Sequence, residues 1–285
     1  MRIKKDDSFL NRDSKTIKSF GDEWNKYDQS DLSFDDSLRY FNEYFNVFPW
    51  HKITKDSVGF DMGCGTGRWA KHIASKVGLL NCIEPSDAIN IARKNLGEFK
   101  NVCLIKGDVN NPYLKNASQD FGYSLGVLHH IPDTEKAIEA CVKLLKPGAP
   151  FLIYIYYFFE DRPLWYKYLW LFSNIFRKII SKLPRRLKNF SSDFIALTIY
   201  LPLAKLSKFL ENKSLPVKKI PLSYYRNSSF YTMRTDALDR FGTPLEKRFT
   251  KKEIKDMCLR SGLVDIRFSD SQPFWCCVGY KKDRL

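Results

Sequence analysis

The sequence has no long hydrophobic run, no internal repeat and few residues of the kinds that build disulfides or metal sites. No run of 18 or more apolar residues occurs, so the sequence predicts no membrane-spanning helix. The first 18 residues are polar and charged, unlike a secretory signal peptide, and this favours a cytoplasmic location. The seven cysteines are scattered and odd in number, which is typical of reduced cysteines, and no Cys/His spacing predicts a metal site.

Acidic residues are too few to balance the basic ones. The chain has 47 Lys and Arg against 32 Asp and Glu, a net charge of +15. This excess predicts an acidic partner, which is nucleic acid, an anionic membrane surface or a phosphorylated substrate. More than half of it falls in residues 160–219, which hold 13 Lys and Arg but only four Asp and Glu. At 285 residues and 44% hydrophobic content, the chain can form one globular domain with an insertion.

Glycine is also sparse, yet three glycines fall at alternate positions in one short segment, Gly63, Gly65 and Gly67. They follow an apolar run that passes through Asp61, and a helix-like segment comes next. This order predicts a strand, a tight turn and a helix, the arrangement that holds nucleotides in α/β proteins. The spacing G-x-G-x-G differs from the dinucleotide pattern G-x-G-x-x-G. The preceding carboxylate of Asp61 suits a cationic ligand better than a phosphate.

The segment D-x-G-x-G-x-G at residues 61–67 resembles motif I of the Rossmann-like, class I S-adenosylmethionine (SAM) methyltransferases. The resemblance implies that this turn binds the methionine and ribose end of SAM and releases S-adenosylhomocysteine. It also implies that Glu84, 21 residues after Gly63, accepts the ribose hydroxyls, and that Asp108 accepts the adenine amino group. Residues 126–130, G-V-L-H-H, resemble the segment of the ubiquinone-biosynthesis-like methyltransferases that lines the methionine end of the pocket.

The alternation of predicted strands and helices favours an α/β fold with a doubly wound sheet. We expect seven strands, mostly parallel, with an antiparallel last strand, together with N-terminal helices and a helical insertion after the fifth strand. The predicted parts are a tail with cap helices, a SAM-binding core, a basic aromatic insertion and the end of the core sheet, at residues 1–50, 51–157, 158–247 and 248–285. The strands are expected at 58–62, 79–83, 102–105, 121–125, 151–157, 263–269 and 274–281, and residues 1–19 are expected to be a polar tail.

The candidate site residues fall into two groups. For catalysis we single out His129 as a general base, because imidazole titrates near neutral pH, and Tyr156, Tyr225 and Arg226 as residues that line the acceptor site. Trp24 and Tyr27 lie three positions apart on one helical face, so they either cap the cofactor or pack on the sheet. The predicted cofactor-binding residues are Asp61, Gly63, Cys64, Gly65, Gly67, Glu84, Pro85, Asp108, Val109, Gly126, Trp24 and Tyr27.

The insertion carries apolar side chains at three- and four-residue steps from Trp165 to Ile179, with lysines and arginines between and after them. Such helices either lie on an anionic membrane or bury their apolar faces on each other or in a homodimer. We therefore expect a SAM-dependent methyltransferase that acts on a small-molecule, lipid-linked or glycan acceptor, with an anionic group for the basic insertion to bind. The alternatives are a nucleic-acid methyltransferase, for which no RNA-binding module or N/D-P-P-Y/F motif is present, and a non-enzymatic SAM-binding protein.

Overall fold

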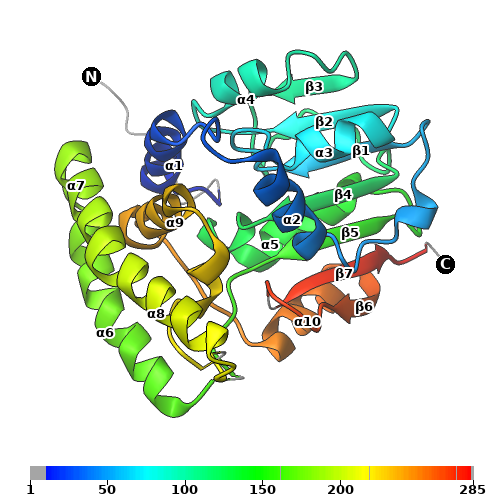
Figure 1. Cartoon of the computed structure of the whole chain (residues 1–285). Helices are drawn as coiled ribbons and strands as arrows, with labels where there is room; N and C mark the ends of the chain where they lie inside the picture. The colour runs from blue at the N-terminus through cyan, green and yellow to red at the C-terminus, as the bar shows by residue number, and fades with distance from the viewer. Residues whose placement is uncertain (1–10, 161, 218, 274, 284–285) are drawn as a thin grey trace. The chain divides into compact units, whose positions relative to one another are not determined.

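A computed structural model describes residues 11–160, 162–217, 219–273 and 275–283. Within these residues the chain forms one seven-stranded sheet in the order β3-β2-β1-β4-β5-β7-β6. Figure 1 shows this sheet with helices on both of its faces. The strands are β1 (Val58–Met62), β2 (Leu79–Ile83), β3 (Val102–Ile105), β4 (Phe121–Leu125), β5 (Pro150–Tyr154), β6 (Leu263–Phe268) and β7 (Cys276–Lys281).

The strand directions confirm the predicted fold class. Strands β1 to β5 pair in parallel, and β7 inserts antiparallel between β5 and β6. Because β1 lies in the middle and the chain winds outward from it in both directions, the strand order reverses between β1 and β4. Open α/β sheets bind ligands at such a switch point, beyond the carboxyl ends of the strands.

Helices cover the sheet and exclude water from its centre. One buried cluster joins Phe60 of β1, Ile138 and Ile254, the last two from α5 and α10. Aromatic rings also pack on the sheet, and the centroid of the Phe45 ring lies 5.3 Å from that of Tyr123 of β4. The helices of this part of the chain are α1 (Ser14–Lys26), α2 (Phe34–Tyr44), α3 (Ala70–Ile73), α4 (Ile89–Asn95), α5 (Thr134–Leu144) and α10 (Lys251–Arg260). Three short helices accompany them, η2 (Trp50–Lys52), η3 (Ala74–Lys76) and η4 (Leu128–His130). A capping box between Thr250 and Glu253 begins α10.

The chain divides into two compact units. The first contains the sheet and comprises residues 1–25, 37–158 and 245–285. The second comprises residues 26–36 and 159–244, so a short piece of the N-terminal region joins the insertion. Its helices are α6 (Leu164–Ile180), α7 (Arg185–Ile195), η5 (Ala196–Tyr200), α8 (Leu201–Asn212), η6 (Ser223–Asn227) and α9 (Phe230–Gly242).

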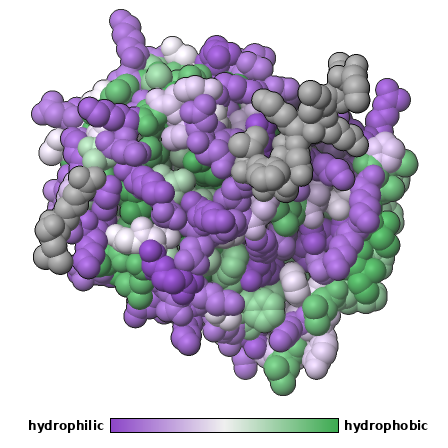
Figure 2. Space-filling model, turned by 180° about the vertical axis from the view of Figure 1, so that it is seen from behind, coloured by the Kyte–Doolittle hydropathy of each residue, from purple (hydrophilic) through white to green (hydrophobic). Residues whose placement is uncertain are grey.

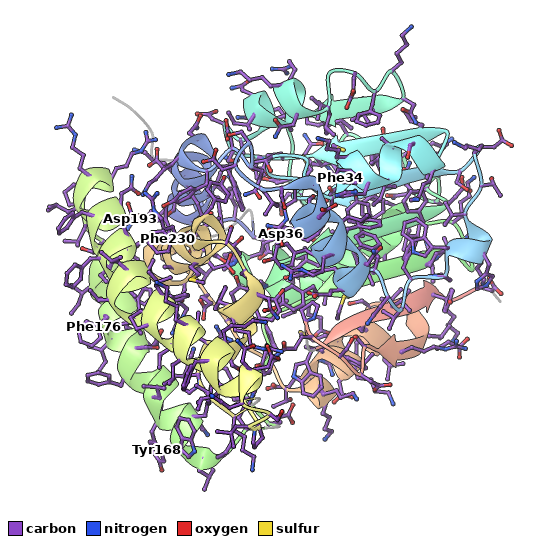
Figure 3. All side chains as sticks on the ribbon, in the orientation of Figure 1. Phe34, Asp36, Tyr168, Phe176, Asp193 and Phe230 are labelled. Atoms are coloured by element: carbon purple, nitrogen blue, oxygen red, sulfur yellow. The ribbon has the colours of Figure 1, made fainter. Side chains whose placement is uncertain are left out.

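A small apolar core and a half-buried charge cluster stabilise the helical unit. The apolar core includes Ile180, Ala204, Met233 and Phe241. Asp193 of α7, labelled in Figure 3, accepts hydrogen bonds from side chains of the 26–36 segment and of α9, and this convergence lowers its pKa to about 2 although partial burial opposes the shift. Tertiary contacts of this kind, rather than helix propensity alone, decide where such helices pack.

Three predicted boundaries are corrected by the structure. Residues 14–19 are not a tail but the first half of α1, where Asp13 accepts the N–H of Thr16 at 2.7 Å. The fifth strand ends at Tyr154, three residues early, because the chain then leaves β5 and Tyr157 bridges to Phe249. The last strand begins at Cys276, and Phe274, its expected first residue, lies outside the described residues, as do residues 1–10.

None of the helices in the described ranges combines the length and the apolar content that a membrane span requires.

Candidate functional site

The glycine loop leaves the carboxyl end of β1. Gly63 has a φ of +80°, and a Cβ there would lie 2.6 Å from the methyl groups of Val127. Gly67 has a φ of +79°, and a Cβ there would lie 2.6 Å from Leu96. Both positions therefore require glycine for conformation and for space. The loop is fixed to the neighbouring strand because the N–H of Gly63 donates to the carbonyl of Ile83 at 2.8 Å.

Asp61 lies at the end of β1 and is almost fully buried, with 1% of its surface exposed. Its Oδ2 atom has no hydrogen-bond partner within the described residues. Burial raises the pKa of Asp61 to about 8; the adjacent Tyr123 hydroxyl opposes this shift, and the charge of Glu84 adds to it. A buried carboxylate oxygen without a partner is costly. A bound cation would satisfy Asp61 and stabilise its charged form.

Glu84 follows β2 and connects the loop to the next strand end. Its Oε2 accepts the N–H of Gly65 at 3.0 Å, and its Oε1 accepts the N–H of Ser86 at 2.9 Å. Each carboxylate oxygen can accept a second hydrogen bond. Glu84 is therefore held in place by the backbone and retains acceptor capacity for hydroxyl groups of a ligand.

Asp108 lies in the turn after β3. Its Oδ1 accepts the N–H groups of Asn110 and Asn111, at 2.9 Å and 3.2 Å. Its Oδ2 lies 3.8 Å from a guanidinium nitrogen of Arg12, a residue just before α1. No sequence pattern predicted this ion pair, since Arg12 lies in the segment that was expected to be a tail.

Four more of the predicted cofactor residues, Cys64, Pro85, Val109 and Gly126, lie in the segments that follow β1 to β4. Gly126, at the end of β4, has a φ of +76°, and a Cβ there would meet no atom within 4 Å. Open space beside a strand end is where a ligand can approach the backbone closely. Cys64 and Val109 are buried and Pro85 is half-buried. A hydrogen bond with Cys82 and burial raise the pKa of Cys64, so its thiol stays neutral.

Helix α1 lies over these strand ends. The indole Nε1 of Trp24 is 3.4 Å from the point where a Cβ of Gly65 would lie, which places the ring directly on the glycine loop. A Cβ at Gly21 would be 3.4 Å from Ser86, in the turn after β2. The helix therefore lies in van der Waals contact with the turn that follows Glu84.

The same N-terminal region reaches the other two strand ends. Phe20 of α1 packs edge-on against His130, with ring centroids 4.8 Å apart, in the segment after β4. Arg12 pairs with Asp108 after β3. The region from Arg12 to Trp24 therefore contacts the segments that follow β1, β2, β3 and β4. An element in this position can exclude water from a ligand held at those strand ends.

The chemistry of this edge fits SAM. Asp61, Glu84 and Asp108 are carboxylates that follow or end three neighbouring strands, and SAM carries an ammonium group, a sulfonium, two ribose hydroxyls and an adenine amino group. The unpartnered oxygen of Asp61 and the spare acceptor capacity of Glu84 match the first and third of these groups. Three acids would instead repel a phosphate-bearing nucleotide. We assign Asp61, Glu84, Asp108 and the glycine loop as the residues that would hold the cofactor.

A row of aromatic rings continues from the glycine loop along the ends of β5 and β4. Trp69 packs against Tyr44 at 4.7 Å between ring centroids, and Tyr44 packs against Tyr154 at 5.0 Å. Tyr154 then neighbours Tyr156 at 5.9 Å, and the Tyr156 ring lies 3.9 Å from that of His129, tilted by 33°. Of these five, the sequence had singled out Tyr156 and His129 as site residues. The contribution of Tyr44, from α2, depends on tertiary packing that no local pattern encodes.

His129 is fully buried, and neither of its ring nitrogens has a hydrogen-bond partner among the described residues. Burial lowers its pKa well below the usual value, and the neighbouring His130 and Arg248 lower it further. The imidazole is therefore neutral at pH 7. His130 differs, because its Nδ1 lies 2.6 Å from the carbonyl oxygen of Leu245.

A buried ion pair lies beside this aromatic row. Arg248 contacts Glu246 with Nε and Oε1 3.0 Å apart, and its guanidinium lies 5.0 Å from the centre of the Tyr156 ring. It also donates to the carbonyl of Tyr157 at 3.3 Å. Arg248 thus fixes the segment after β5 and presents a positive charge against Tyr156. Nothing in the sequence distinguished Arg248 from the many other arginines.

Three predicted site residues have partners inside the helical unit. The hydroxyl of Tyr27 donates to Asp193 at 2.8 Å. The hydroxyl of Tyr225 donates to Asp236 at 2.8 Å, and burial raises the pKa of Tyr225. Arg226 pairs with Glu211 at 2.7 Å and donates to the carbonyl of Ser223. These contacts engage the polar groups of all three residues, and a role in binding cofactor or acceptor stays a prediction.

The comparisons with known proteins agree with this geometry. Residues 60–153 match the family model described as a methyltransferase domain. The chain is 34% identical over 103 residues to the protein named probable tRNA methyltransferase 9B from Mus musculus, covering 35% of this chain and 22% of that protein. It is 30% identical over 128 residues to norajmaline N-methyltransferase from Rauvolfia serpentina, covering 43% and 42%. The chain therefore spans less than half the length of these relatives.

The fold has a counterpart that extends beyond the matched segment. A provisionally assigned SAM-dependent methyltransferase from Methanococcus maripaludis superposes with a TM-score of 0.52, at 14% identity and with 96% of this chain and 98% of that chain covered. At this identity the likeness concerns the fold alone. Residues 60–153 therefore match a methyltransferase domain, and the sheet that contains them has the Rossmann-like fold of the class I methyltransferases, with a carboxylate-lined glycine loop that fits SAM.

Proposed function

We propose that this protein is an enzyme that transfers the methyl group of SAM to a small-molecule, lipid-linked or glycan acceptor. The observation that carries the proposal is the buried, unpartnered carboxylate oxygen of Asp61 next to the conformationally fixed glycine loop. SAM would supply an electrophilic methyl group on a sulfonium, and an acceptor nucleophile would displace the thioether. The protein then has to orient the two reactants and exclude water, which is the main source of catalysis in such a transfer.

The aromatic row from Trp69 to His129 supports a site for the acceptor. Aromatic faces bind apolar or ring-shaped molecules, and a few polar groups fix their orientation. Tyr154 is the last residue of β5, and Tyr156 lies two positions beyond it. Strand β5 is the neighbour of β4, which Gly126 follows. Burial raises the pKa of Tyr154, so this side chain presents a neutral hydroxyl.

His129 is the residue best suited to accept a proton from the acceptor. Its neutral imidazole has two buried nitrogens without partners in the described chain, and buried polar atoms of this kind normally have one. A hydroxyl or amine of the acceptor would supply that partner. The low pKa keeps the imidazole unprotonated but also makes it a weak base, so orientation of the acceptor is its main proposed contribution.

A nucleic-acid acceptor is the second candidate. The net charge of +15 and the name of the mouse relative favour it. The two candidates differ in their salt dependence, because contacts with several phosphates weaken binding steeply as salt is added. Binding of transfer RNA that falls steeply with salt, together with methyl incorporation into that RNA, would favour the second candidate.

The experiment that tests the proposed activity is a transfer assay with radiolabelled SAM. The purified protein is incubated with pools of small molecules, polar lipids, oligosaccharides and RNA, and each pool is separated and counted. The proposal predicts incorporation into one non-RNA pool, lost in the Asp61→Asn variant. Absence of SAM binding would contradict both candidates, and SAM binding without incorporation in any pool would favour a non-enzymatic SAM-binding protein.

A further inference from the structure

The outer face of α6 is apolar over its whole length. Nine of its side chains have between 44% and 78% of their surface exposed, and none of them carries a charge. At 100° per residue these positions cover an arc of about 160° along a helix about 25 Å long. In Figure 3, Tyr168 and Phe176 project from the outer side of this helix. The nine residues, here called the α6 outer face, are Leu164, Trp165, Tyr168, Leu169, Leu171, Phe172, Ile175, Phe176 and Ile179.

The inner face of the same helix carries polar groups beside the buried Ile180. Arg177 is buried and donates to the carbonyls of Thr243 and Pro244, at 2.9 Å and 2.8 Å. Its Nε donates to Asn174 at 2.7 Å. Amphipathic helices of water-soluble proteins normally bury the apolar side and expose the polar side. Here the hydrogen bonds of Arg177 hold the helix in the opposite orientation, so the expectation that these apolar faces bury on each other is wrong for α6.

Helix α7 repeats this arrangement. Leu187, Phe190 and Phe194 are more than half exposed. On the inner side, Ser192 is buried and Asp193 accepts two hydrogen bonds from Arg234, both at 3.0 Å. Figure 2 shows hydrophobic side chains gathered along the right-hand edge of the view. Because Figure 2 is seen from behind, this edge corresponds to the left-hand side of Figure 1, where α6 and α7 lie. Apolar surface this extensive, with a polar border, marks an interaction site.

Basic side chains lie at the junction of the two helices. Lys178, Lys182 and Arg186 are exposed, and none of them forms an ion pair with any described residue. Residues 159–244 as a whole hold 16 Lys and Arg against six Asp and Glu, a net charge of +10. The surface therefore combines bare apolar and aromatic side chains with uncompensated positive charge.

We propose that the outer faces of α6 and α7 dock on an anionic membrane surface, with both helices lying in the plane of the interface. Aromatic and aliphatic side chains would enter the region between headgroups and acyl chains, while the lysines and arginine contact anionic headgroups. Charge argues against a second copy as the occupant, because pairing would bring together two copies of residues 159–244, each with a net charge of +10. The outer face of α6 has no hydrogen-bonding side chain other than the Trp165 and Tyr168 tips, which argues against nucleic acid.

Vesicle flotation tests this proposal with the whole 285-residue chain. Vesicles of phosphatidylcholine with about 30% phosphatidylserine are compared with vesicles of phosphatidylcholine alone. We expect the protein to float with the anionic vesicles and to bind them at least about tenfold more tightly than the neutral ones, with weaker binding in high salt. The assay contains no SAM and no acceptor, so its result is independent of the proposed transfer activity.

Two variants with matched controls assign the binding to this surface. Changing Tyr168, Phe172 and Phe176 together to Ser is expected to reduce binding about tenfold or more, whereas Leu259→Ser, an exposed apolar change on α10, leaves it unchanged. Changing Lys178, Lys182 and Arg186 together to Glu is expected to abolish binding to anionic vesicles, since each basic side chain contributes about fivefold. The triple control Lys71→Glu, Lys94→Glu and Lys255→Glu makes the same change in net charge on the sheet unit.

Several outcomes would overturn the proposal. One is wild-type protein that stays in the bottom fraction while the anionic vesicles float, although its circular dichroism shows folded helices. Another is equal loss of binding in the basic triple variant and its control, which would mean that net charge alone drives association. A third is a wild-type dimer in light scattering that the Tyr168, Phe172 and Phe176 variant converts to a monomer, because the surface would then be an interface between copies.

Discussion

The carboxylate of Glu84 accepts the N–H of Gly65 at 3.0 Å, so the acid at the end of β2 supports the loop that leaves β1. The same carboxylate accepts the N–H of Ser86 with its other oxygen. Hydrogen bonds to a charged acceptor are stronger than those between neutral groups. Glu84 thereby has two tasks, since it positions the glycine loop before any ligand arrives and offers its remaining acceptor capacity to the ribose.

Replacing Glu84 by Gln is expected to weaken both tasks. The variant keeps one carbonyl oxygen but loses the charge, so we expect the free energy of unfolding to fall by about 1–2 kcal/mol and SAM affinity to fall about tenfold or more. Urea unfolding and calorimetric titration measure the two effects. Asp87→Asn is the matched control, since that carboxylate lies nearby but is exposed and pairs with Lys106. Comparable losses in both variants would contradict the assignment.

Asp61 predicts how cofactor affinity depends on pH. Its pKa is raised to about 8, and a bound cation would favour the ionised form, so binding should release a proton at neutral pH. Affinity for SAM is expected to increase by up to about tenfold per pH unit from about pH 6 toward pH 8, until the amino group of the ligand itself loses its proton. In Asp61→Asn this increase should disappear. A wild-type affinity that is flat over this range would contradict the role of Asp61.

The same shift predicts the pH dependence of folding without ligand. Because the folded-state pKa of Asp61 lies above the unfolded value of 3.8, the folded state favours the protonated form. This contribution is fully present below about pH 4 and is lost as the pH rises toward about 8. The melting temperature of the wild type should therefore fall relative to that of Asp61→Asn as the pH rises between these limits. A difference that is constant with pH would mean that Asp61 titrates normally.

Trp24 predicts that α1 contributes to cofactor affinity. Its ring lies on Gly65, so Trp24→Ala would open the loop to water and is expected to weaken SAM binding about tenfold. Trp165→Ala, which removes a half-exposed indole from α6, provides the control and should leave the affinity unchanged. If Trp24→Ala binds SAM as well as the wild type does, α1 packs on the sheet unit without capping the ligand.

His129 predicts a selective effect on turnover. His129→Gln is expected to lower kcat about a hundredfold while SAM affinity stays within a factor of about two, because the ring of His129 packs against Tyr156 in the aromatic row. Since the pKa of His129 is lowered, the wild-type rate should persist as the pH falls below about 6.5 and decline only as the pH passes through the lowered pKa. His72→Gln, at a second inward-facing histidine, should leave kcat nearly unchanged. A His129→Gln variant with normal kcat would remove this residue from the mechanism.

The strands and their mostly parallel arrangement could be expected from the sequence because each core strand is a short apolar run followed by turn chemistry. Asp61, Glu84 and Asp108 each end or directly follow such a run, and the parallel arrangement then brings them to one edge. The first turns of α1 were missed, since residues 14–19 are held by the Asp13 cap and by burial of Thr16, which are not features of an apolar pattern. The length of β5 was overestimated because Tyr156 and Tyr157 look like strand residues but pair with Phe249 instead.

The acceptor side was less predictable for a physical reason. Tyr225 and Arg226 sit in a segment rich in hydrogen-bonding groups, and only the fold shows that Asp236 and Glu211 engage them. The same holds for Tyr44, whose place in the aromatic row depends on the packing of α2. The orientation of α6 is a further example, because the periodicity of its apolar residues is the same whether that face is buried or exposed. The buried position of Arg177 decides it.

The most direct test of the central claim is a calorimetric titration of the purified protein with S-adenosylhomocysteine, carried out in parallel on Asp61→Asn. We predict saturable binding of one ligand per chain to the wild type, with an affinity at least about tenfold lower in the variant, because the carboxylate contributes a charge-assisted hydrogen bond to the ligand's amino group. No binding to the folded wild type, or equal binding to both proteins, would contradict the assignment of the glycine loop and Asp61 as the SAM site.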